Sequence, residues 1–451
     1  MNSILNKQRD FYSSGITKKL DFRMANLNKL KDIILKNEKY IMEGLKKDLN
    51  KSEFESYSTE IGISLSEITY TTKNLKKWAK PKKVKTPMTE FKAKSYIHPE
   101  PYGNTFIISP WNYPFQLSIT PLIGSIAAGN TSIIKPSSTS RYTSKVLEEL
   151  INSNFNSEYI FAATGEGSKA LLDEKFDYIF YTGSVPVGKL VMEKAAKHLT
   201  PITLELGGKS PCIVDKDGDM DLFAKRIVWG KFLNSGQTCV APDYLLVHKS
   251  IKEVLIKNII KYIEEFYGKN QKDNPEYIKI INEKQFNRLL GLINSGNIIY
   301  GGEYDKEAFF ISPTLIDEVT WDSPIMGEEI FGPIFPILKY EDLDEAIKIV
   351  NSHPKPLALY FFSTDNEKIE KVIKNTSYGG GCINDTIMHL SSPCLPFGGV
   401  GNSGMGSYHG KQSFDTFTHY KSILKRSNAF DPNFRYPPYK DKINTVKKFL
   451  K

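Results

Sequence analysis

Residues 177–206 read DYIFYTGSVPVGKLVMEKAAKHLTPITLEL, and this stretch predicts a strand, a turn, a helix and a second strand. A strand is expected for the apolar run DYIFY, and a turn follows at Thr182, Gly183 and Ser184. The segment KLVMEKAAKHL is helical in pattern, and a second apolar run, PITLEL, comes after it. A helix between two such strands predicts a right-handed βαβ unit in a parallel sheet.

The same alternation extends from this unit in both directions. Near-continuous apolar runs of this kind suit strands that are covered on both faces. Open sheets of this class bind ligands beyond the carboxyl ends of their strands. The sequence therefore predicts an α/β protein with a doubly wound, Rossmann-like sheet. The other runs are NTFIISP (104–110), TSIIKP (131–136), EYIFAATG (158–165), SPCIVD (210–215), DYLLVH (243–248), ALYFFS (358–363) and GGGCIND (379–385).

The length of 451 residues exceeds the roughly 250–300 residues that one hydrophobic core usually serves. At least two domains are therefore expected. Residues 1–80 show helical spacing of their apolar positions, and residues 81–100 are polar and extended in character. Residues 410–425 contain FDTFTHYKSIL, whose alternation of apolar and polar residues is typical of a late edge strand.

The formal charge of +9 comes mainly from lysine, because only seven of the 60 basic residues are arginine. These lysines are scattered along the chain, which favours a solvated surface over a nucleic-acid interface. No apolar run approaches the ~20 residues of a membrane-spanning helix, and the N-terminus lacks the apolar core of a signal peptide. We expect a cytoplasmic protein with no transmembrane anchor, and no metal site, since no Cys-x-x-Cys pair or histidine cluster is present.

One cysteine has a context that favours chemistry. Cys239 ends the run GKFLNSGQTC, and the turn at Gly236 could make its backbone approachable. A single cysteine is more often a buried small apolar residue. That second interpretation is kept for Cys212, Cys382 and Cys394.

Two carboxylates and one amide also follow strand-like or turn-like segments. Glu205 lies in TLELGGKSP, where burial at a strand end would raise its pKa and suit a general base. Glu329 lies in MGEEIFGP, where a carboxylate at a helix end is an equally good account. Asn112 lies in SPWNYP and is either an oxyanion donor or an ordinary turn residue.

The turn after the strand DYIFY is a candidate phosphate site. Gly183 and Gly188 flank the start of the following helix, where free backbone N–H groups and the positive end of the helix dipole would face an anion. The spacing is not the GxGxxG fingerprint, so the turn alone is a weak signal.

Taken together, the motifs resemble the aldehyde dehydrogenase superfamily, in which they occur in the same order. The resemblance covers nearly the whole chain and is closest to the class 3 branch of aromatic and fatty aldehyde dehydrogenases. The motifs are SPWNYP (109–114), TGSVPVGK (182–189), LELGGKSP (204–211), FLNSGQTCVAPDY (232–244), EEIFGP (328–333), PFGGVGNSGMGSYHGKQSFDTFTH (396–419) and FRYPPY (434–439).

The resemblance implies oxidation of an aldehyde to a carboxylic acid with NAD or NADP. Cys239 would attack the aldehyde to give a thiohemiacetal, and Asn112 with the Cys239 backbone N–H would hold the oxyanion. Glu205 would activate the water that hydrolyses the resulting thioester. Glu329 would hold the nicotinamide ribose and is also a candidate base in this branch, so the division between the two carboxylates stays open.

The resemblance also implies the cofactor-binding residues. Lys135 would approach the adenosine ribose, and Phe331 would lie beside the nicotinamide. Related enzymes often carry glutamate at the position of Ser138, and its absence here removes a repulsion against a 2′-phosphate. We therefore expect NADP to be used at least comparably to NAD. The other expected cofactor-binding residues are Thr182, Gly183, Ser184, Gly188 and Leu206, together with Glu329.

The family layout implies three parts and a homodimer. The expected divisions are an NAD(P)-binding domain at 1–80 and 101–207, a catalytic domain at 208–405, a small oligomerisation sheet from 81–100 and 406–430, and a C-terminal tail at 431–451. That tail is lysine-rich, unlike the hydrophobic anchor of some fatty-aldehyde members.

Two alternatives remain within the superfamily. A CoA-acylating relative would pass the thioester to another acceptor, and such relatives generally lack the glutamate found at position 205. A catalytically silent structural member would have lost the nucleophile, yet Cys239 is present. Aromatic or medium- to long-chain aliphatic aldehydes are the expected substrates, because several aromatic residues near the motifs either line an apolar entrance or pack in the core. They are Tyr113, Phe115, Trp229 and Phe232.

Overall fold

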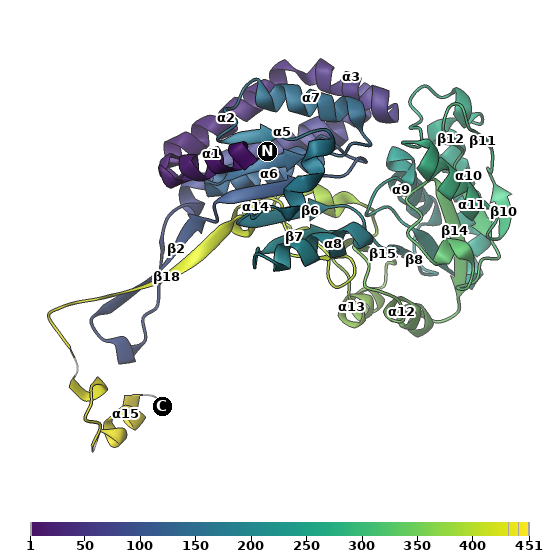
Figure 1. The fold of residues 1–451 in the computed structure, drawn as a ribbon. Coiled ribbons are helices and arrows are strands. Elements are labelled where there is room, and N and C mark those ends of the chain that lie inside the picture. The colour runs from purple at the N-terminus through teal and green to yellow at the C-terminus, as the bar shows by residue number, and fades with distance from the viewer. Residues whose placement is uncertain (1, 432, 441, 450–451) are drawn as a thin grey trace.

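The computed structural model describes residues 2–431, 433–440 and 442–449. Two helix-covered sheets lie side by side, and a long arm projects from the first of them, with the C-terminal segment at its tip (Figure 1). No helix in these described ranges combines the length and the apolar character needed to cross a bilayer.

The first sheet has six strands in the order β17-β7-β6-β3-β4-β5. Neighbours from β7 to β5 pair in parallel, and β17 pairs antiparallel with β7. The prediction for 177–206 is confirmed, because β6 and β7 pair in parallel with α8 between them. The bounds are β3 Asn104–Ile108, β4 Thr131–Lys135, β5 Ile160–Ala162, β6 Tyr178–Thr182, β7 Ile202–Glu205, β17 Gly404–Met405, α6 Gln116–Ala128, α7 Arg141–Asn152 and α8 Val185–Ala196.

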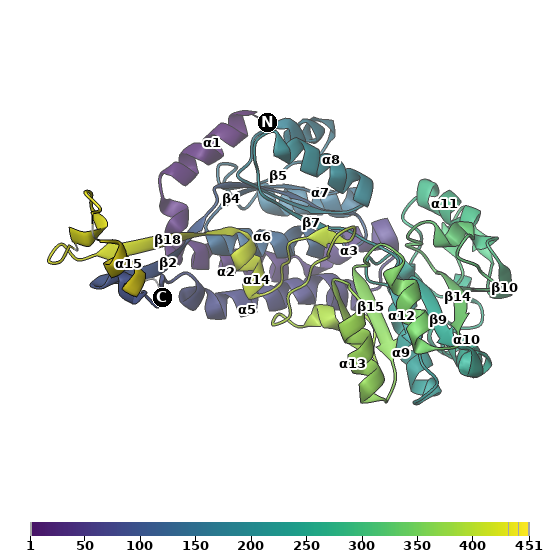
Figure 2. The same cartoon turned by 90° about the horizontal axis from the view of Figure 1, so that it is seen from below.

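Helices cover both faces of this sheet, as a doubly wound fold requires. Helices α1 and α8 lie on one face, and α2, α5 and α6 lie on the other (Figure 2). Alternate strand residues serve the two faces: Phe106 packs in the cluster that contains Leu5 of α1, and Ile107 packs in the larger core. The N-terminal helices are α1 Asn2–Ser13, α2 Leu20–Lys36, α3 Glu38–Leu49, α4 Glu53–Ser56 and α5 Gly62–Trp78.

The second sheet has seven strands in the order β10-β13-β14-β9-β8-β15-β16. Only β10 runs antiparallel, and it lies at the edge. Its strands are β8 Pro211–Val214, β9 Tyr244–His248, β10 Asn297–Tyr300, β13 Thr314–Asp317, β14 Ile334–Tyr340, β15 Ala358–Phe362 and β16 Gly380–Ile383. Its helices are α9 Met220–Phe232, α10 Lys252–Tyr267, α11 Glu283–Ile293, α12 Leu343–Asn351 and α13 Asn366–Asn375, and a small pair is formed by β11 Tyr304–Asp305 and β12 Phe310–Ile311.

The arm is a three-stranded antiparallel sheet in the order β1-β2-β18. Its strands are β1 Lys82–Val84, β2 Ala93–Pro101 and β18 Thr418–Arg426. Strands β2 and β18 pair over their whole length, from Thr418 opposite Pro101 to Arg426 opposite Ala93.

Two expectations about this C-terminal region are wrong in detail. Residues expected to begin the late strand form the short helix α14, Lys411–Thr416, because Phe414 is buried against Trp78 with ring centroids 5.8 Å apart. The expected catalytic domain at 208–405 includes β17, Gly404–Met405, which pairs with β7 of the first sheet. The expected tail at 431–451 contains the helix α15, Ile443–Phe449, and its residues 432, 441, 450 and 451 lie outside the described residues.

Candidate active site

The loop that carries Cys239 makes a strained turn directly after α9. Asn234, Ser235 and Gly236 adopt successive left-handed conformations with φ of 54°, 51° and 71°. Such conformations are uncommon for residues other than glycine and persist where surrounding contacts impose them. Here the Asn234 N–H donates to Glu55 Oε1 at 2.9 Å, and a Cβ on Gly236 would lie 2.3 Å from the Gly332 carbonyl oxygen. The turn therefore holds Cys239 in one place.

Cys239 is partly buried, and the charges of two carboxyl groups act on its thiol. Burial raises the pKa of its thiol above the usual range, and the nearby Glu329 and Glu205 raise this pKa further. The backbone N–H groups of Cys239 and Val240 donate toward the sulfur and act in the opposite direction. A thiol in this setting needs a base to remove its proton before it can act as a nucleophile.

Asn112 lies next to this loop and is almost fully buried. The Asn112 side-chain Nδ2 donates to the Gln237 backbone carbonyl oxygen at 3.0 Å. The Asn112 backbone carbonyl oxygen accepts from Asn234 Nδ2, also at 3.0 Å. An amide nitrogen carries two hydrogens, so Nδ2 has a second one to donate. The amide is thus fixed against the cysteine loop in the manner required of an oxyanion donor.

A buried ion pair holds the segment that bears Asn112, and nothing in the sequence pointed to it. Lys51 Nζ and Glu60 Oε1 are 2.6 Å apart, and both side chains are fully buried. Lys51 Nζ also donates to the Asn112 carbonyl oxygen at 3.3 Å. The second oxygen of Glu60 accepts the backbone N–H groups of Phe115 and Gln116, each at 2.9 Å, where α6 begins. A buried pair keeps its charges only with such additional hydrogen bonds, so this network fixes the Asn112 loop on α6.

The two candidate carboxylates come together around one short segment. Glu205 ends β7, and in the described part of the chain neither of its buried oxygens has a hydrogen-bond partner. Burial raises the pKa of Glu205 well above its usual range. The Glu329 carboxyl group contacts Gly207, since a Cβ on Gly207 would lie 2.1 Å from Glu329 Oε2. The Gly208 backbone N–H donates to the same carboxyl group. Burial raises the pKa of Glu329 to about 8.

The turn after β6 has the groups that a dinucleotide pyrophosphate needs. Helix α8 begins at Val185 without a side-chain cap from Ser184, and the buried Thr182 hydroxyl has no partner among the described residues. A Cβ on Gly188 would lie 2.8 Å from Leu206, so the glycine lets α8 lie close to the end of β7. An uncapped helix start beside an unpartnered hydroxyl fits an anionic ligand.

Other expected cofactor contacts lie at the same carboxyl edge of the first sheet. Lys135 ends β4, and Ser138 follows it on the surface. Phe331 has a φ of 51° and packs edge-on against Trp111 with ring centroids 5.3 Å apart. Figure 1 places the ends of β6 and β7 toward the second sheet. Cys239 lies between α9 and β9 of that part of the chain, and Glu329 lies between β13 and β14.

Comparison with known proteins decides the family. A family model described as the aldehyde dehydrogenase family matches residues 16–423. The chain belongs to this family. It is therefore an aldehyde dehydrogenase, an oxidoreductase that oxidises aldehydes to acids with NAD or NADP.

Its relatives match over nearly their whole length. The chain is 51% identical to 4,4'-diaponeurosporen-aldehyde dehydrogenase of Staphylococcus aureus, with 100% of both proteins covered. It is 48% identical to the mouse aldehyde dehydrogenase named dimeric NADP-preferring, covering 97% of this chain and 98% of that protein. A solved structure of S. aureus AldH in its substrate-bound state superposes with a TM-score of 0.98 at 50% identity, covering 100% of this chain and 99% of that one.

The aromatic residues expected near the substrate of this dehydrogenase fall into two groups. Tyr113 lies at the site, because its hydroxyl is 2.6 Å from Thr238 Oγ1, next to Cys239. Phe115 and Phe232 are about 1% exposed and pack in the large core, so core packing accounts for them. Trp229 is 38% exposed on α9 and is free to contact a ligand.

The remaining cysteines of the dehydrogenase do not share one environment. Cys212 is buried in β8, and Cys382 is partly buried with its sulfur 3.5 Å from His389 Nδ1. The expectation that Cys394 is buried is wrong: it is exposed, because it lies in a surface turn that Ser392 caps.

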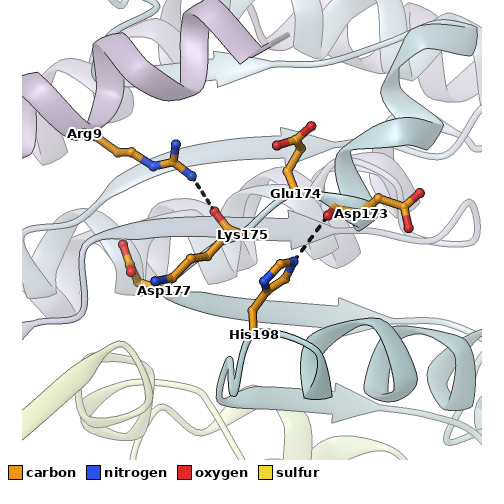
Figure 3. A pocket seen from close by; sticks show the side chains of 6 residues that line it. All are labelled: Arg9, Asp173, Glu174, Lys175, Asp177 and His198. Carbon is orange, nitrogen blue, oxygen red and sulfur yellow. Dashed lines mark hydrogen bonds between the residues drawn. The ribbon is translucent and has the colours of Figure 1, made fainter.

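A polar hollow of about 590 Å³ lies away from this site (Figure 3). It opens where β6 begins, at the edge opposite the carboxyl ends of the parallel strands. Arg9 donates to the Lys175 carbonyl oxygen at 2.9 Å, and the His198 ring lies 3.3 Å from the Asp173 carbonyl oxygen. Since ligands of such sheets bind at the carboxyl ends, the hollow is not part of the active site.

Proposed function

We propose that Cys239 is the nucleophile of the dehydrogenase. Its sulfur attacks the aldehyde carbon while a neighbouring carboxylate takes the thiol proton, which gives a thiohemiacetal. The second N–H of Asn112 and the Cys239 backbone N–H stabilise the oxyanion. Supporting this are the fixed Asn112 amide and the two carboxyl groups whose charges reach the thiol.

Glu205 is proposed to act in the second half of the reaction. NAD(P)+ held at the turn of Thr182 and the start of α8 would supply the hydride acceptor for this step, which would leave Cys239 as a thioester. Glu205 removes a proton from water, the hydroxide oxygen bonds to the thioester carbon, and the Cys239 sulfur leaves. Its burial without a hydrogen-bond partner in the described chain suits a base that is to meet water.

The observation that carries this proposal is that the charges of two carboxyl groups, the buried Glu205 and the partly buried Glu329, both act on the Cys239 thiol. The experiment supplies an aldehyde with NAD or NADP and measures both reduced nicotinamide and carboxylic acid. Acid formed in equal amount to reduced nicotinamide supports hydrolysis. Turnover only with added CoA, and a CoA thioester as product, would favour the acylating alternative, and no turnover at all would favour a silent structural protein.

The substrates are proposed to be large apolar aldehydes, aromatic or medium- to long-chain aliphatic. The apolar side chains of Trp229 and Met388 are 38% and 45% exposed. The residues next to them in sequence, Gly230 and Ile387, pack against each other, so the two exposed side chains belong to one region of the surface. The S. aureus relative is named for 4,4'-diaponeurosporen-aldehyde. Steady-state kinetics over a series of aliphatic and aromatic aldehydes, with that aldehyde included, tests this proposal: kcat/KM should rise with apolar size.

NADP is proposed to be used at least comparably to NAD, because Ser138 places no carboxylate near the adenosine ribose. Replacing Ser138 with glutamate should lower kcat/KM for NADP relative to NAD by roughly tenfold or more, through repulsion of the 2′-phosphate. Ser138→Gln is the matched control, because glutamine is as long as glutamate but carries no charge. A wild-type preference for NAD above about a hundredfold would contradict the proposal.

A homodimer is proposed to form through the arm. Strand β18 pairs with β2 on one side, and among the described residues no strand pairs with its other edge. It exposes Ile423 (38%) and Leu424 (50%). Light scattering should give twice the chain mass of 51.2 kDa. Lysine at both positions should shift the protein toward monomer, whereas Leu35→Lys on α2, also an exposed leucine, should not. A monomeric wild type at micromolar concentration would rule the arm out as a stable interface.

A further inference from the structure

Two basic side chains hold the loop that carries Glu329. We call residues 325–331 the Glu329 loop. Lys209 Nζ donates to the carbonyl oxygens of Ile325 and Glu328, each at 2.9 Å. Arg288 continues the series, with Nη1 3.3 Å from the Glu329 carbonyl oxygen and Nη2 2.6 Å from that of Ile330. Two cations therefore bind four backbone carbonyls of one loop.

The carboxyl group of Asp243 completes this arrangement. Asp243 Oδ2 lies 2.5 Å from Lys209 Nζ, and Asp243 Oδ1 accepts the backbone N–H of Ile330 at 2.8 Å. The Lys209 and Asp243 side chains are 16% and 4% exposed, so solvent screens the pair only weakly. Charge-assisted hydrogen bonds of this kind are the stronger ones in proteins, which makes the loop geometry specific.

Lys209 belongs to the same segment that positions both active-site carboxyl groups. That segment begins with Glu205, continues with Gly207, against which the Glu329 carboxylate leans, and with Gly208, whose N–H donates to it. Lys209 follows and binds the loop from which Glu329 comes. One five-residue segment thus carries one carboxylate and fixes the other.

We propose that Lys209 and Arg288 are positioning residues for Glu329. They keep its carboxylate against Gly207 and hence at a constant place relative to Glu205 and Cys239. Neutralising Asp243 would require only one cation near its carboxylate. It would not account for the two loop carbonyls that Lys209 binds, or for the two further loop carbonyls that Arg288 binds. The catalytic consequence rests on the proposed function, in which Glu329 either holds the nicotinamide ribose or acts as a base, while the effect on the loop itself does not.

Hydrogen–deuterium exchange of the full-length protein tests the effect on the loop. Lys209→Met and the milder Arg288→Lys should each speed exchange of amides in residues 325–331 by about tenfold or more. Lys252→Met is the matched control, because Lys252 is also 16% exposed and pairs with Asp317, but contacts no backbone carbonyl in the described chain. Unchanged exchange in the loop, or the same increase in the Lys252 variant, would overturn the proposal.

Kinetics in two backgrounds tests the consequence for catalysis. Lys209→Met should lower kcat/KM about tenfold in the wild type and have no further effect when Glu329 is already glutamine. Equal losses in both backgrounds would show that Lys209 acts otherwise than through Glu329 and would overturn the positioning role. If Glu329→Gln alone retains full activity, the proposed role of Glu329 fails instead, and loop exchange still decides whether the two cations hold the loop. Should Lys209→Met not fold, Arg288→Lys serves in the same cycle.

Discussion

Cys239→Ala is expected to abolish aldehyde-dependent reduction of the nicotinamide, with a loss in kcat of roughly four orders of magnitude or more. The thioester must form on a nucleophile, and Cys239 is the proposed one. The strained turn at 234–236 holds it next to Asn112 and within reach of the charges of the two carboxyl groups. Alanine leaves this geometry but offers no atom that can bond to the aldehyde carbon. The measurement is the rate of nicotinamide reduction at saturating aldehyde and cofactor.

The exposed Cys394 supplies the control for this variant. Cys394→Ala removes a thiol on the surface and should keep the wild-type rate. An acylated form of the wild type, trapped by rapid acid quench, should carry its added mass on the peptide that contains Cys239. Equal rates for wild type and Cys239→Ala would mean that another group forms the covalent bond or that none is formed.

Much of the sheet architecture could be predicted because its signal is local. Each strand of the first sheet except β17 is a short apolar run that ends at a turn residue, and the run 177–206 predicts β6, α8 and β7 in order. Helix α14 could not be predicted in this way, since its sequence alternates like a strand. It is helical because Phe414 fits against Trp78, a residue more than 300 positions earlier in the chain.

The candidate site was predictable to the extent that its residues lie in recognisable motifs. Cys239, Asn112 and Glu205 each do, and the structure brings them together. Lys51 and Glu60 do not, because a lysine and a glutamate in a charged helical segment have no signature in sequence. Their role depends on contacts with a segment some 60 residues away, which only the fold creates.

The Glu329 loop shows the same limit. Lys209, Asp243 and Arg288 belong to three different elements or turns, and each alone is an ordinary charged residue. Their common function follows from four backbone carbonyls that meet them in space. Sequence patterns specify which atoms are available, and long-range packing specifies which of them meet.

Glu205→Gln is expected to separate the two halves of the reaction. Glutamine has the shape of glutamate but cannot accept a proton, so thioester hydrolysis should slow by roughly 100- to 10,000-fold. The first half should still run once, giving a burst of about one reduced nicotinamide per Cys239, followed by a slow steady state. Rapid-mixing absorbance measurements give the burst amplitude and the steady rate.

The pH dependence gives a second, independent readout. Because burial holds the pKa of Glu205 well above its usual range, the fraction that is ionised and able to act as a base grows as pH rises. The wild-type kcat should therefore increase with pH, and Glu205→Gln should lose this increase. Glu329→Gln is the matched comparison: burial also raises the pKa of Glu329, to about 8, so its variant removes a different rising limb.

The two glutamine variants together assign the base. A burst with slow turnover in Glu205→Gln, and weaker cofactor binding in Glu329→Gln, would place water activation on Glu205. Slow turnover after a burst in Glu329→Gln, with weaker cofactor binding in Glu205→Gln, would instead place water activation on Glu329. The structure permits this, because the charge of Glu329 also acts on the Cys239 thiol. Loss of the burst itself in Glu205→Gln would instead mean that Glu205 takes the thiol proton. In each case the two carboxylates are compared in one arrangement, in which Glu205 ends β7 and Glu329 lies against Gly207 two residues later.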